Sequence, residues 1–432
     1  MTSKKALQPL RWLRLDNAAK IYPAARRRHW STVFRQSVTL TEPVDVPVLQ
    51  GALEVCVARF PSIAARLRKG AFWYYLQQVD RAPAIREEYS CPLAYMSREE
   101  MRRCAFRVIV HDRRIAVEFF HALTDGTGAL VFLKNLCAEY LERKYGISVP
   151  AEEGIVDRRE PPRAEELEDS FLRYAGKVTA QRRDTDAWRM TGQPEPDGFV
   201  NLTCFRLPAA QTLELAHRYG VTLTVFLGAV LMQALLELQA AQQPDPARRK
   251  PVKLLIPVNL RRLFPSSTLR NFAMFTIPEL DARMGEYTFE EICDVIRHRM
   301  GLEVTAKHMG AVLSANVRDE RNPVLRLVPL PIKNLVMKAV FDSVGERKAC
   351  LNLSNLGAVR VPQVMERYID RFDFVLGVQS TGPYNCGVIS WGDTVNVSFI
   401  RSIVRPGLEQ HFHQVLQRMG LPVTVESNRN ER

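Results

Sequence analysis

The sequence predicts a mixed α/β protein built as two lobes, and three observations lead to that prediction. The chain has 432 residues, which is enough for two units of ordinary domain size. Short runs with alternating apolar residues, typical of strands, occur among stretches with helical periodicity on both sides of one charged segment. That segment, residues 151–197, is rich in Glu, Asp, Arg and Pro, as exposed crossovers are. We therefore expect an N-terminal lobe at 1–150 and a C-terminal lobe at 198–432.

The N-terminal lobe is predicted to combine a sheet with two long helices. Its expected strands are Val33–Leu40, Phe106–Val110 and Arg114–Phe120, and Phe72–Leu76 is a short aromatic run. Its expected helices are Val44–Arg59 and Ala129–Tyr145. The last two strands are close enough in sequence to form a hairpin.

The C-terminal lobe shows the same mixture of elements. Its expected strands are Val200–Leu207, Lys253–Val258, Lys348–Leu353, Phe372–Val378, Gly387–Ser390 and Thr394–Ile400. Its expected helices are Ala209–Tyr219, Leu223–Gln239, Thr288–Met300, Val324–Asp342 and Gly407–Met419. Pro329 and Pro331 are expected to kink or divide the fourth of these helices. The tail Glu426–Arg432 is expected to fray.

Composition narrows the class of protein and the kind of partner. With 46% hydrophobic and 25% charged residues, the chain is neither collagen-like, coiled-coil nor largely disordered. The formal charge of +13 attracts polyanions such as nucleic acid, anionic lipid or coenzyme A. The basic run Arg26–Trp30 is typical of a solvated face, and no basic stripe interleaved with aromatic residues follows it. Nucleic acid is therefore not expected as a partner.

Cysteine usage and hydropathy indicate a cytoplasmic protein. The eight cysteines are scattered without a Cys-x-x-Cys pair, as buried thiols of a reducing compartment are. The basic N-terminus lacks the apolar core of a signal peptide. The apolar run Val221–Gln239 contains Gln233 and Glu237, so it is expected to be a buried core helix rather than a transmembrane segment.

The most informative stretch runs from Ile115 to Gly128. Strand alternation puts His121 on the same face as the apolar residues before it, at the end of the strand. A poorly solvated histidine there is neutral at pH 7, with one ring nitrogen able to accept a proton. Asp125 follows at a turn before a helix, where its carboxylate also suits an N-cap. These residues fit either a structural turn or a general base beside a carboxylate.

The spacing His121-x-x-x-Asp125-Gly126 resembles the HxxxDG signature of the chloramphenicol acetyltransferase-like superfamily, which includes condensation domains and alcohol acetyltransferases. Further stretches carry the resemblance along nearly the whole chain: Leu15–Pro23, Thr222–Ala229, Ile256–Arg262 with Arg270–Phe272, and Leu353–Gly357. The opening stretch is similar to the bacterial alcohol acetyltransferase branch, near the polyketide-associated acyltransferases. Phe120 stands where condensation domains carry a second His, and the Asp-Phe-Gly-Trp-Gly motif of the plant branch is absent.

This resemblance implies a two-lobed α/β fold with mixed sheets and a tunnel at the lobe interface. His121 would be the general base that takes the proton of an alcohol as the alcohol directly attacks an acyl-CoA thioester. Asp125 would point away from the substrate and pair with an arginine, for which Arg261 is the candidate and Arg262 the alternative. Gly126 completes the motif.

The resemblance also implies candidates for the rest of the site. Ser354, Asn355 and Trp391 are the candidates for oxyanion stabilisation or tunnel lining. Acyl-CoA is expected as a co-substrate, with no permanently bound cofactor. No metal is expected, since the chain holds no His-Glu-x-x-His motif and His411 and His413 would lie on different faces of a helix.

Several alternatives stay open at this point. The donor could be an acyl-carrier-protein thioester, the product could be an amide as in condensation domains, or the fold could serve a non-catalytic binding protein. The expected acceptor is a small or lipid-like alcohol. We expect a cytoplasmic monomer, with membrane-surface association open for a lipid-like acceptor.

Overall fold

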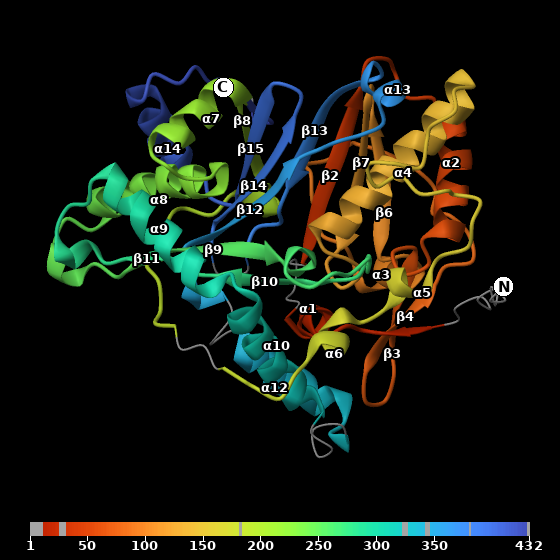
Figure 1. Ribbon diagram of the computed structural model, residues 1–432, viewed down its shortest axis with the longest axis horizontal. Coiled ribbons are helices and arrows are strands. Elements are labelled where there is room, and N and C mark those ends of the chain that lie inside the picture. The colour runs from red at the N-terminus through yellow and green to blue at the C-terminus, as the bar shows by residue number, and fades with distance from the viewer. Residues whose placement is uncertain are drawn as a thin grey trace.

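Two lobes lie side by side in the computed structural model, each with its own sheet and covering helices (Figure 1). The structure describes residues 12–25, 32–180, 184–321, 327–341, 346–379 and 382–429. The basic run Arg26–Trp30 lies outside the described residues.

The first lobe contains a five-stranded sheet of order β13-β2-β7-β6-β5 and a small sheet of order β1-β4-β3. Its strands are β1 (Leu13–Arg14), β2 (Val33–Leu40), β3 (Ala65–Lys69), β4 (Tyr74–Gln78), β5 (Arg86–Glu87), β6 (Phe106–His111), β7 (Arg114–Phe120) and β13 (Ile369–Val375). Its helices are α1 (Ile21–Ala25), α2 (Val46–Arg59), α3 (Arg98–Arg103) and α4 (Gly126–Tyr145). The hairpin β6–β7 forms as the sequence predicts.

Local signals start and stop the long helices that cover this sheet. Asp45 caps α2 by accepting from the Val48 N–H (3.0 Å), and Asp125 caps α4 in the same manner. α4 ends at Gly146, whose φ of 65° is the left-handed conformation that glycine adopts without strain. The motif residues before α4 are therefore held between a strand end and a capped helix start.

The second lobe is built on an eight-stranded sheet, with the path β10-β9-β12-β14-β15-β8-β16 and β11 beside β9. Its strands are β8 (Asn201–Pro208), β9 (Val252–Asn259), β10 (Ala273–Thr276), β11 (Glu279–Leu280), β12 (Leu351–Ala358), β14 (Tyr384–Trp391), β15 (Thr394–Arg401) and β16 (Thr424–Ser427). Its helices are α7 (Ala209–Arg218), α8 (Leu223–Gln242), α9 (Phe289–Glu303), α10 (Ala306–Arg321), α12 (Leu330–Val340) and α14 (Gly407–Arg418). The short helix α13 (Gln363–Glu366) lies on the first lobe, where Met365 packs in the core. Two short helices, α5 (Ala164–Leu167) and α6 (Ser170–Tyr174), lie in the crossover.

α8 is the core helix of the second lobe. Among the described residues it is the one helix long and apolar enough to cross a membrane. Its apolar side chains, Phe226 and Leu231 among them, are buried in the cluster that joins α8 to β9, β12 and β14. This burial is typical of the core helix of a globular lobe, as the polar residues within the run predict.

One strand of the second half of the chain belongs to the first lobe. β13 pairs antiparallel with β2, from Ile369 beside Leu40 to Val375 beside Arg35. Its buried side chains Phe372 and Phe374 pack in the first lobe's core. The first lobe's sheet thus includes a strand from beyond residue 198, where the composition predicts the second lobe to begin. The local sequence does not indicate this, because the pairing of β13 with β2 depends on contacts between distant residues.

Three other elements differ from the sequence prediction. The stretch expected as a helix at Val324–Asp342 contains α12, which begins after Pro329, while residues 322–326 and 342–345 lie outside the described residues. α10 was not predicted, although Met309, Leu313 and Val317 repeat every four residues along its buried face. Glu426 and Ser427 do not fray, because they pair with β8 as part of β16.

Candidate active site

His121 lies directly after β7, at the point where the first lobe meets the second. Its backbone N–H donates to the Thr32 carbonyl (2.8 Å), and its side chain is partly exposed. The ring stacks on Tyr22 of α1, with centroids 4.5 Å apart, and meets the edge of Phe34 at 5.0 Å. Burial among these rings lowers the pKa of His121 from its usual value, against the opposing effect of hydrogen bonds and of the Asp125 charge. This shift favours the neutral form of the imidazole.

A hydrogen-bond chain fixes which ring nitrogen of His121 carries the proton. The Asp16 carboxylate accepts from Asn271 Nδ2 (3.3 Å), so the Asn271 amide must turn its oxygen toward the ring. Asn271 Oδ1 lies 3.1 Å from His121 Nδ1 and accepts its proton. In the neutral ring, Nε2 then carries the lone pair. This is the protonation state that a general base requires.

Asp16 is itself held in place by both lobes. Its carboxylate accepts from the Ala19 N–H (2.7 Å) and faces Arg270, with Nε at 3.8 Å. Burial raises the pKa of Asp16, and the charge of Arg270 opposes that rise. Since Arg270 and Asn271 are neighbours in the second lobe, Asp16 ties the N-terminal segment to the loop that orients His121.

Asp125 uses both carboxylate oxygens and joins the lobes. Oδ1 accepts from the N–H groups of Thr127 (3.1 Å) and Gly128 (3.0 Å), which caps α4. Oδ2 accepts from Arg261 Nη1 (2.7 Å) and from the Phe272 N–H (2.8 Å). The first lobe's motif turn is therefore bonded to the second lobe's loop at two points.

The structure brings Arg261 rather than Arg262 to Asp125. The pair has one nitrogen-to-oxygen contact instead of the bidentate geometry that the residue types allow. The other guanidinium donors reach carbonyl oxygens of the same loop, Nε to Thr268 (2.9 Å) and Nη2 to Arg270 (2.6 Å). Arg261 thus shapes the 261–270 loop and anchors it to Asp125, while Arg262 is exposed.

The motif glycines are required by close packing between the lobes. A Cβ placed on Gly128 would lie 2.2 Å from the Leu269 carbonyl oxygen and from Thr124 Oγ1. A Cβ on Gly126 would lie 2.7 Å from Leu356 Cδ2, in the bulged part of β12. Neither glycine has a positive φ, so absence of a side chain, and not backbone freedom, is what these positions need.

The three candidates for oxyanion stabilisation have different surroundings. The Asn355 amide donates to Thr224 Oγ1 (3.0 Å) and accepts from the Gly357 N–H (2.8 Å). Ser354 is partly exposed, and its hydroxyl makes no hydrogen bond to another described side chain. Trp391 packs edge-on against Phe372 in the first lobe's core. Of the three, only Asn355 has its side-chain donor in a hydrogen bond to another described side chain.

Sequence reasoning missed three residues around the base: Asp16, Tyr22 and Asn271. All three lie within stretches that carry the superfamily resemblance, Leu15–Pro23 and Arg270–Phe272. The sequence signal for these three residues was therefore the resemblance of the two stretches to known acyltransferases. Their contacts with His121 depend on folding and could not be deduced from spacing.

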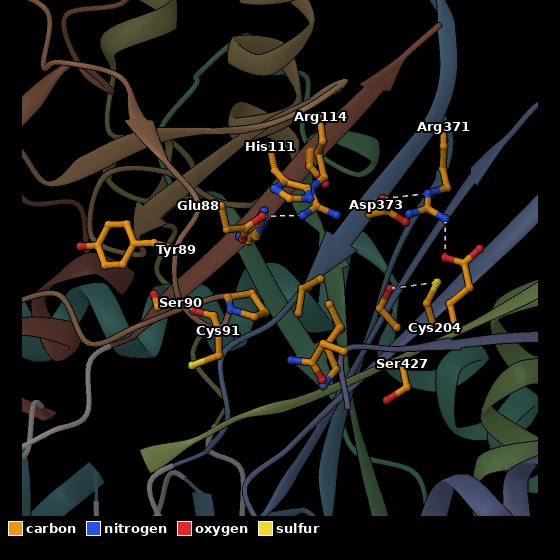
Figure 2. Close-up of a pocket in the computed structure, with 18 of the residues that line it drawn as sticks. Glu88, Tyr89, Ser90, Cys91, His111, Arg114, Cys204, Arg371, Asp373 and Ser427 are labelled. Atoms are coloured by element: carbon orange, nitrogen blue, oxygen red, sulfur yellow. Dashed lines mark hydrogen bonds and ion pairs between the residues drawn. The ribbon is translucent and has the colours of Figure 1, made fainter. Parts of the chain in front are cut away.

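A cavity of about 490 Å³ lies between the two lobes, and charged side chains stand among neutral ones in its lining (Figure 2). Glu88 accepts from Arg114 (2.5 Å), and Arg371 donates to Asp373 (3.0 Å) and to Glu426 of β16 (2.6 Å). These charges neutralise one another in pairs. His121 does not line this cavity, so the tunnel expected at the base stays a prediction.

The described part of the chain offers no set of ligands for a metal ion. No group of three His, Cys, Asp or Glu side chains is arranged there to hold an ion. The eight cysteines are free, and six of them are buried. Burial raises the pKa of the buried thiols, Cys137 to about 12, so they stay protonated.

Comparison with known proteins rests on structure, since no family model and no curated protein matches the sequence. Three solved structures are similar over nearly the full length. Trichothecene 15-O-acetyltransferase from Fusarium sporotrichioides is 12% identical, with a TM-score of 0.60 over 96% of this chain and 99% of that chain. Wax ester synthase/diacylglycerol acyltransferase from Marinobacter aquaeolei VT8 is 14% identical, with a TM-score of 0.55 over 95% and 100%. The starter condensation domain of rhizomide synthetase, in complex with C8-CoA, is 12% identical, with a TM-score of 0.58 over 95% and 94%.

The protein has the chloramphenicol acetyltransferase-like fold. Fold alone does not assign a reaction, which has to be argued from the residues of the site. In this fold the chain places His121 at the seam of the lobes, with Asp125, Arg261 and Gly126 beside it in one bonded unit.

Proposed function

We propose that the protein is an O-acyltransferase that moves an acyl group from coenzyme A to an alcohol, with His121 as general base. The observation that carries the proposal is the contact between His121 Nδ1 and Asn271 Oδ1 (3.1 Å), which leaves Nε2 to accept a proton. Burial, which lowers the pKa of His121, supports it. The similar folds of an acetyltransferase and of a wax ester synthase support acyl transfer as the reaction class.

The proposed reaction balances without a covalent enzyme intermediate. His121 Nε2 takes the proton of the acceptor hydroxyl as its oxygen attacks the thioester carbonyl carbon, forming the new C–O bond. When the tetrahedral intermediate collapses, the C–S bond breaks and the imidazolium returns the proton to the coenzyme A sulfur. Ser354 and Trp391 are the preferred candidates for donor to the developing oxyanion, ahead of Asn355, whose amide already donates to Thr224 Oγ1.

Asp125 and Arg261 support catalysis by holding the base, His121, in position. Their bond holds the loop that contains Asn271 against the turn that follows His121. A shift of about 1 Å in such an arrangement costs on the order of a hundredfold in rate. Both are positioning residues in this proposal, and a tunnel between the lobes would keep water from the thioester.

The net charge of +13 supports a donor that carries phosphates. The acyl-carrier-protein donor and amide formation are distinguished from this proposal by substrate panels. A purified sample is offered acyl-CoA, a carrier-bound acyl group, alcohols and amines in separate assays. Transfer from free acyl-CoA to alcohols is the expected outcome; transfer only from the carrier or only to amines contradicts it.

The deciding experiment replaces the base. His121→Ala is expected to lower kcat by roughly 10²–10⁴-fold, the range of a general base, with little change in KM for acyl-CoA. His298→Ala, at an exposed position on α9, is the matched control and is expected to leave kcat unchanged. Equal activity of His121→Ala and the parent protein contradicts the proposal, and a binding protein without activity would show no transfer in either.

A further inference from the structure

The outer face of α12 exposes an apolar stripe to solvent. Ile332, Leu335 and Val336 follow the i, i+3, i+4 spacing that places side chains on one helix face. Their exposed fractions are 54%, 72% and 55%, and Leu327, just before the helix, is 73% exposed. Exposing several large aliphatic side chains together is unfavourable in water, so such a stripe marks an interaction surface.

Aromatic side chains continue this surface on the small sheet of the first lobe. Phe72, at the turn between β3 and β4, and Trp12, before β1, are 44% and 56% exposed. α12 is fastened to this hairpin, since the Leu330 N–H donates to the Ala71 carbonyl (3.0 Å) and Asn334 Nδ2 to the Tyr74 hydroxyl (3.0 Å). Figure 1 shows α12 and the β3–β4 hairpin projecting at the same lower end of the molecule.

Basic side chains surround the apolar and aromatic ones. Lys333 Nζ lies 3.4 Å from the centre of the Trp73 ring and donates to the Phe72 carbonyl (3.2 Å). Lys338 on α12 and Lys69 and Arg14 on the small sheet are exposed. We call α12, the β3–β4 hairpin and Trp12 together the basal surface.

We propose that the basal surface binds the headgroup region of an anionic lipid bilayer. Aliphatic side chains of a surface helix insert at the acyl boundary, tryptophan and phenylalanine favour the interface, and lysines pair with anionic headgroups. Two copies of this surface would bring positive charge against positive charge, which disfavours a dimer. Nucleic acid would satisfy the cations but leave Leu335 and Val336 without an apolar partner.

The basal surface adjoins the proposed base, and this link rests on the proposed function. α12 packs against α1, whose Tyr22 stacks on His121. A cavity of about 610 Å³ opens at the surface, lined by aromatic residues that include Trp12 and Trp73. A lipid-like alcohol would therefore leave the bilayer close to the site where it reacts.

The test measures binding to lipid vesicles by flotation, without any activity assay, so it stands apart from the proposed function. The full chain is mixed with vesicles of phosphatidylcholine alone or with added phosphatidylglycerol. Wild type is expected to float with the anionic vesicles, and less so as salt rises. The double variant Leu335→Asn/Val336→Asn is expected to bind at least tenfold more weakly, because two aliphatic anchors are lost.

Matched controls are available at exposed apolar positions elsewhere. Met284→Asn/Leu302→Asn removes side chains that are 81% and 77% exposed and is expected to bind like wild type. For charge, Lys338→Glu is expected to weaken binding by roughly fivefold or more, while Lys307→Glu, exposed on α10, leaves it unchanged. Circular dichroism checks that each variant is folded.

Three results would overturn the proposal. The first is that wild type fails to float with anionic vesicles. The second is that Leu335→Asn/Val336→Asn floats as well as wild type. The third is that vesicle binding is absent and the same double variant abolishes a different interaction. That interaction would be a dimer detected by light scattering, or a complex with DNA or an acidic carrier protein detected by filter binding.

Discussion

Two of the arginine–carboxylate contacts that join the lobes differ in what surrounds them. At the motif turn, Asp125 is buried and each of its oxygens accepts two hydrogen bonds, one from Arg261. At the 490 Å³ cavity, Arg371 bridges Asp373 and Glu426, and the Glu426 side chain is 42% exposed. Both contacts connect the same two lobes, but water reaches only the second readily.

This difference separates a site that can host chemistry from one that holds the sheets together. Fully bonded, buried groups keep their geometry, so a neutral imidazole beside Asp125 has fixed partners. Exposed charge pairs are screened by water and salt and impose less order. The two contacts should therefore respond very differently to mutation.

The largest effect is expected at Asp125. Asp125→Ala leaves Arg261 and the Phe272 N–H without their acceptor and removes the cap of α4. Breaking a buried ion pair from one side costs about 3–5 kcal/mol in the free energy of unfolding. Urea denaturation measures the loss, and a loss below about 1 kcal/mol would show that this contact is no stronger than the exposed one.

A smaller, paired effect is expected at the motif glycines. Gly128→Ala meets a backbone carbonyl that cannot move alone, and overpacking of this kind costs about 1–3 kcal/mol. Gly126→Ala meets the end of the flexible Leu356 side chain, and the better helix propensity of alanine, up to about 1 kcal/mol, offsets part of the cost. Thermal unfolding of the two variants should rank Gly128→Ala as the less stable; the reverse order would contradict close packing against Leu269.

The bond between Asn271 and His121 should appear in the pH dependence of catalysis. Because burial lowers the pKa of His121, the acid limb of kcat/KM is expected below pH ~6.5, the usual histidine value. Asn271→Ala removes a partner that raises this pKa, so the limb should move to lower pH. The rate should fall by roughly tenfold, the equivalent of one hydrogen bond. Asn428→Ala, directly after β16, serves as control, and an unmoved acid limb in Asn271→Ala would remove Asn271 from the relay.

The smallest effect is expected at the exposed contact. Glu426→Gln keeps the shape of the side chain but removes the charge that faces Arg371. A partly exposed pair contributes about 0–1 kcal/mol, so urea midpoints should barely change and kcat should not. A loss comparable to that of Asp125→Ala would mean that the two contacts are equivalent.

The sequence was most informative where a short linear pattern coincides with a local structure. The strand end at His121, the capped start of α4 at Asp125 and the buried helix α8 were all predicted from residues near one another in the chain. Arg261 followed from resemblance, and the structure places it on Asp125. Whether these residues perform the roles proposed for them is left to the variants above.

What the sequence could not supply depends on contacts between distant residues. His121 and Asn271 are 150 positions apart, and Asn271 and Asp16 are 255 apart. Neither hydrophobic periodicity nor motif spacing predicts these contacts, because they form only when the lobes pack together. The same is true of β13, whose alternation predicts a strand but not the sheet that it joins.

The position of β13 has a consequence for synthesis on the ribosome. The edge of β2 stays unpaired until residues 369–375 have been translated and have left the exit tunnel. At about 5–20 residues per second, a delay of many seconds separates β2 from its neighbour. An unpaired strand edge is a template for wrong pairing. A nascent chain halted at the crossover would therefore expose this edge, and a split of the gene there would leave the first half without the strand that covers β2.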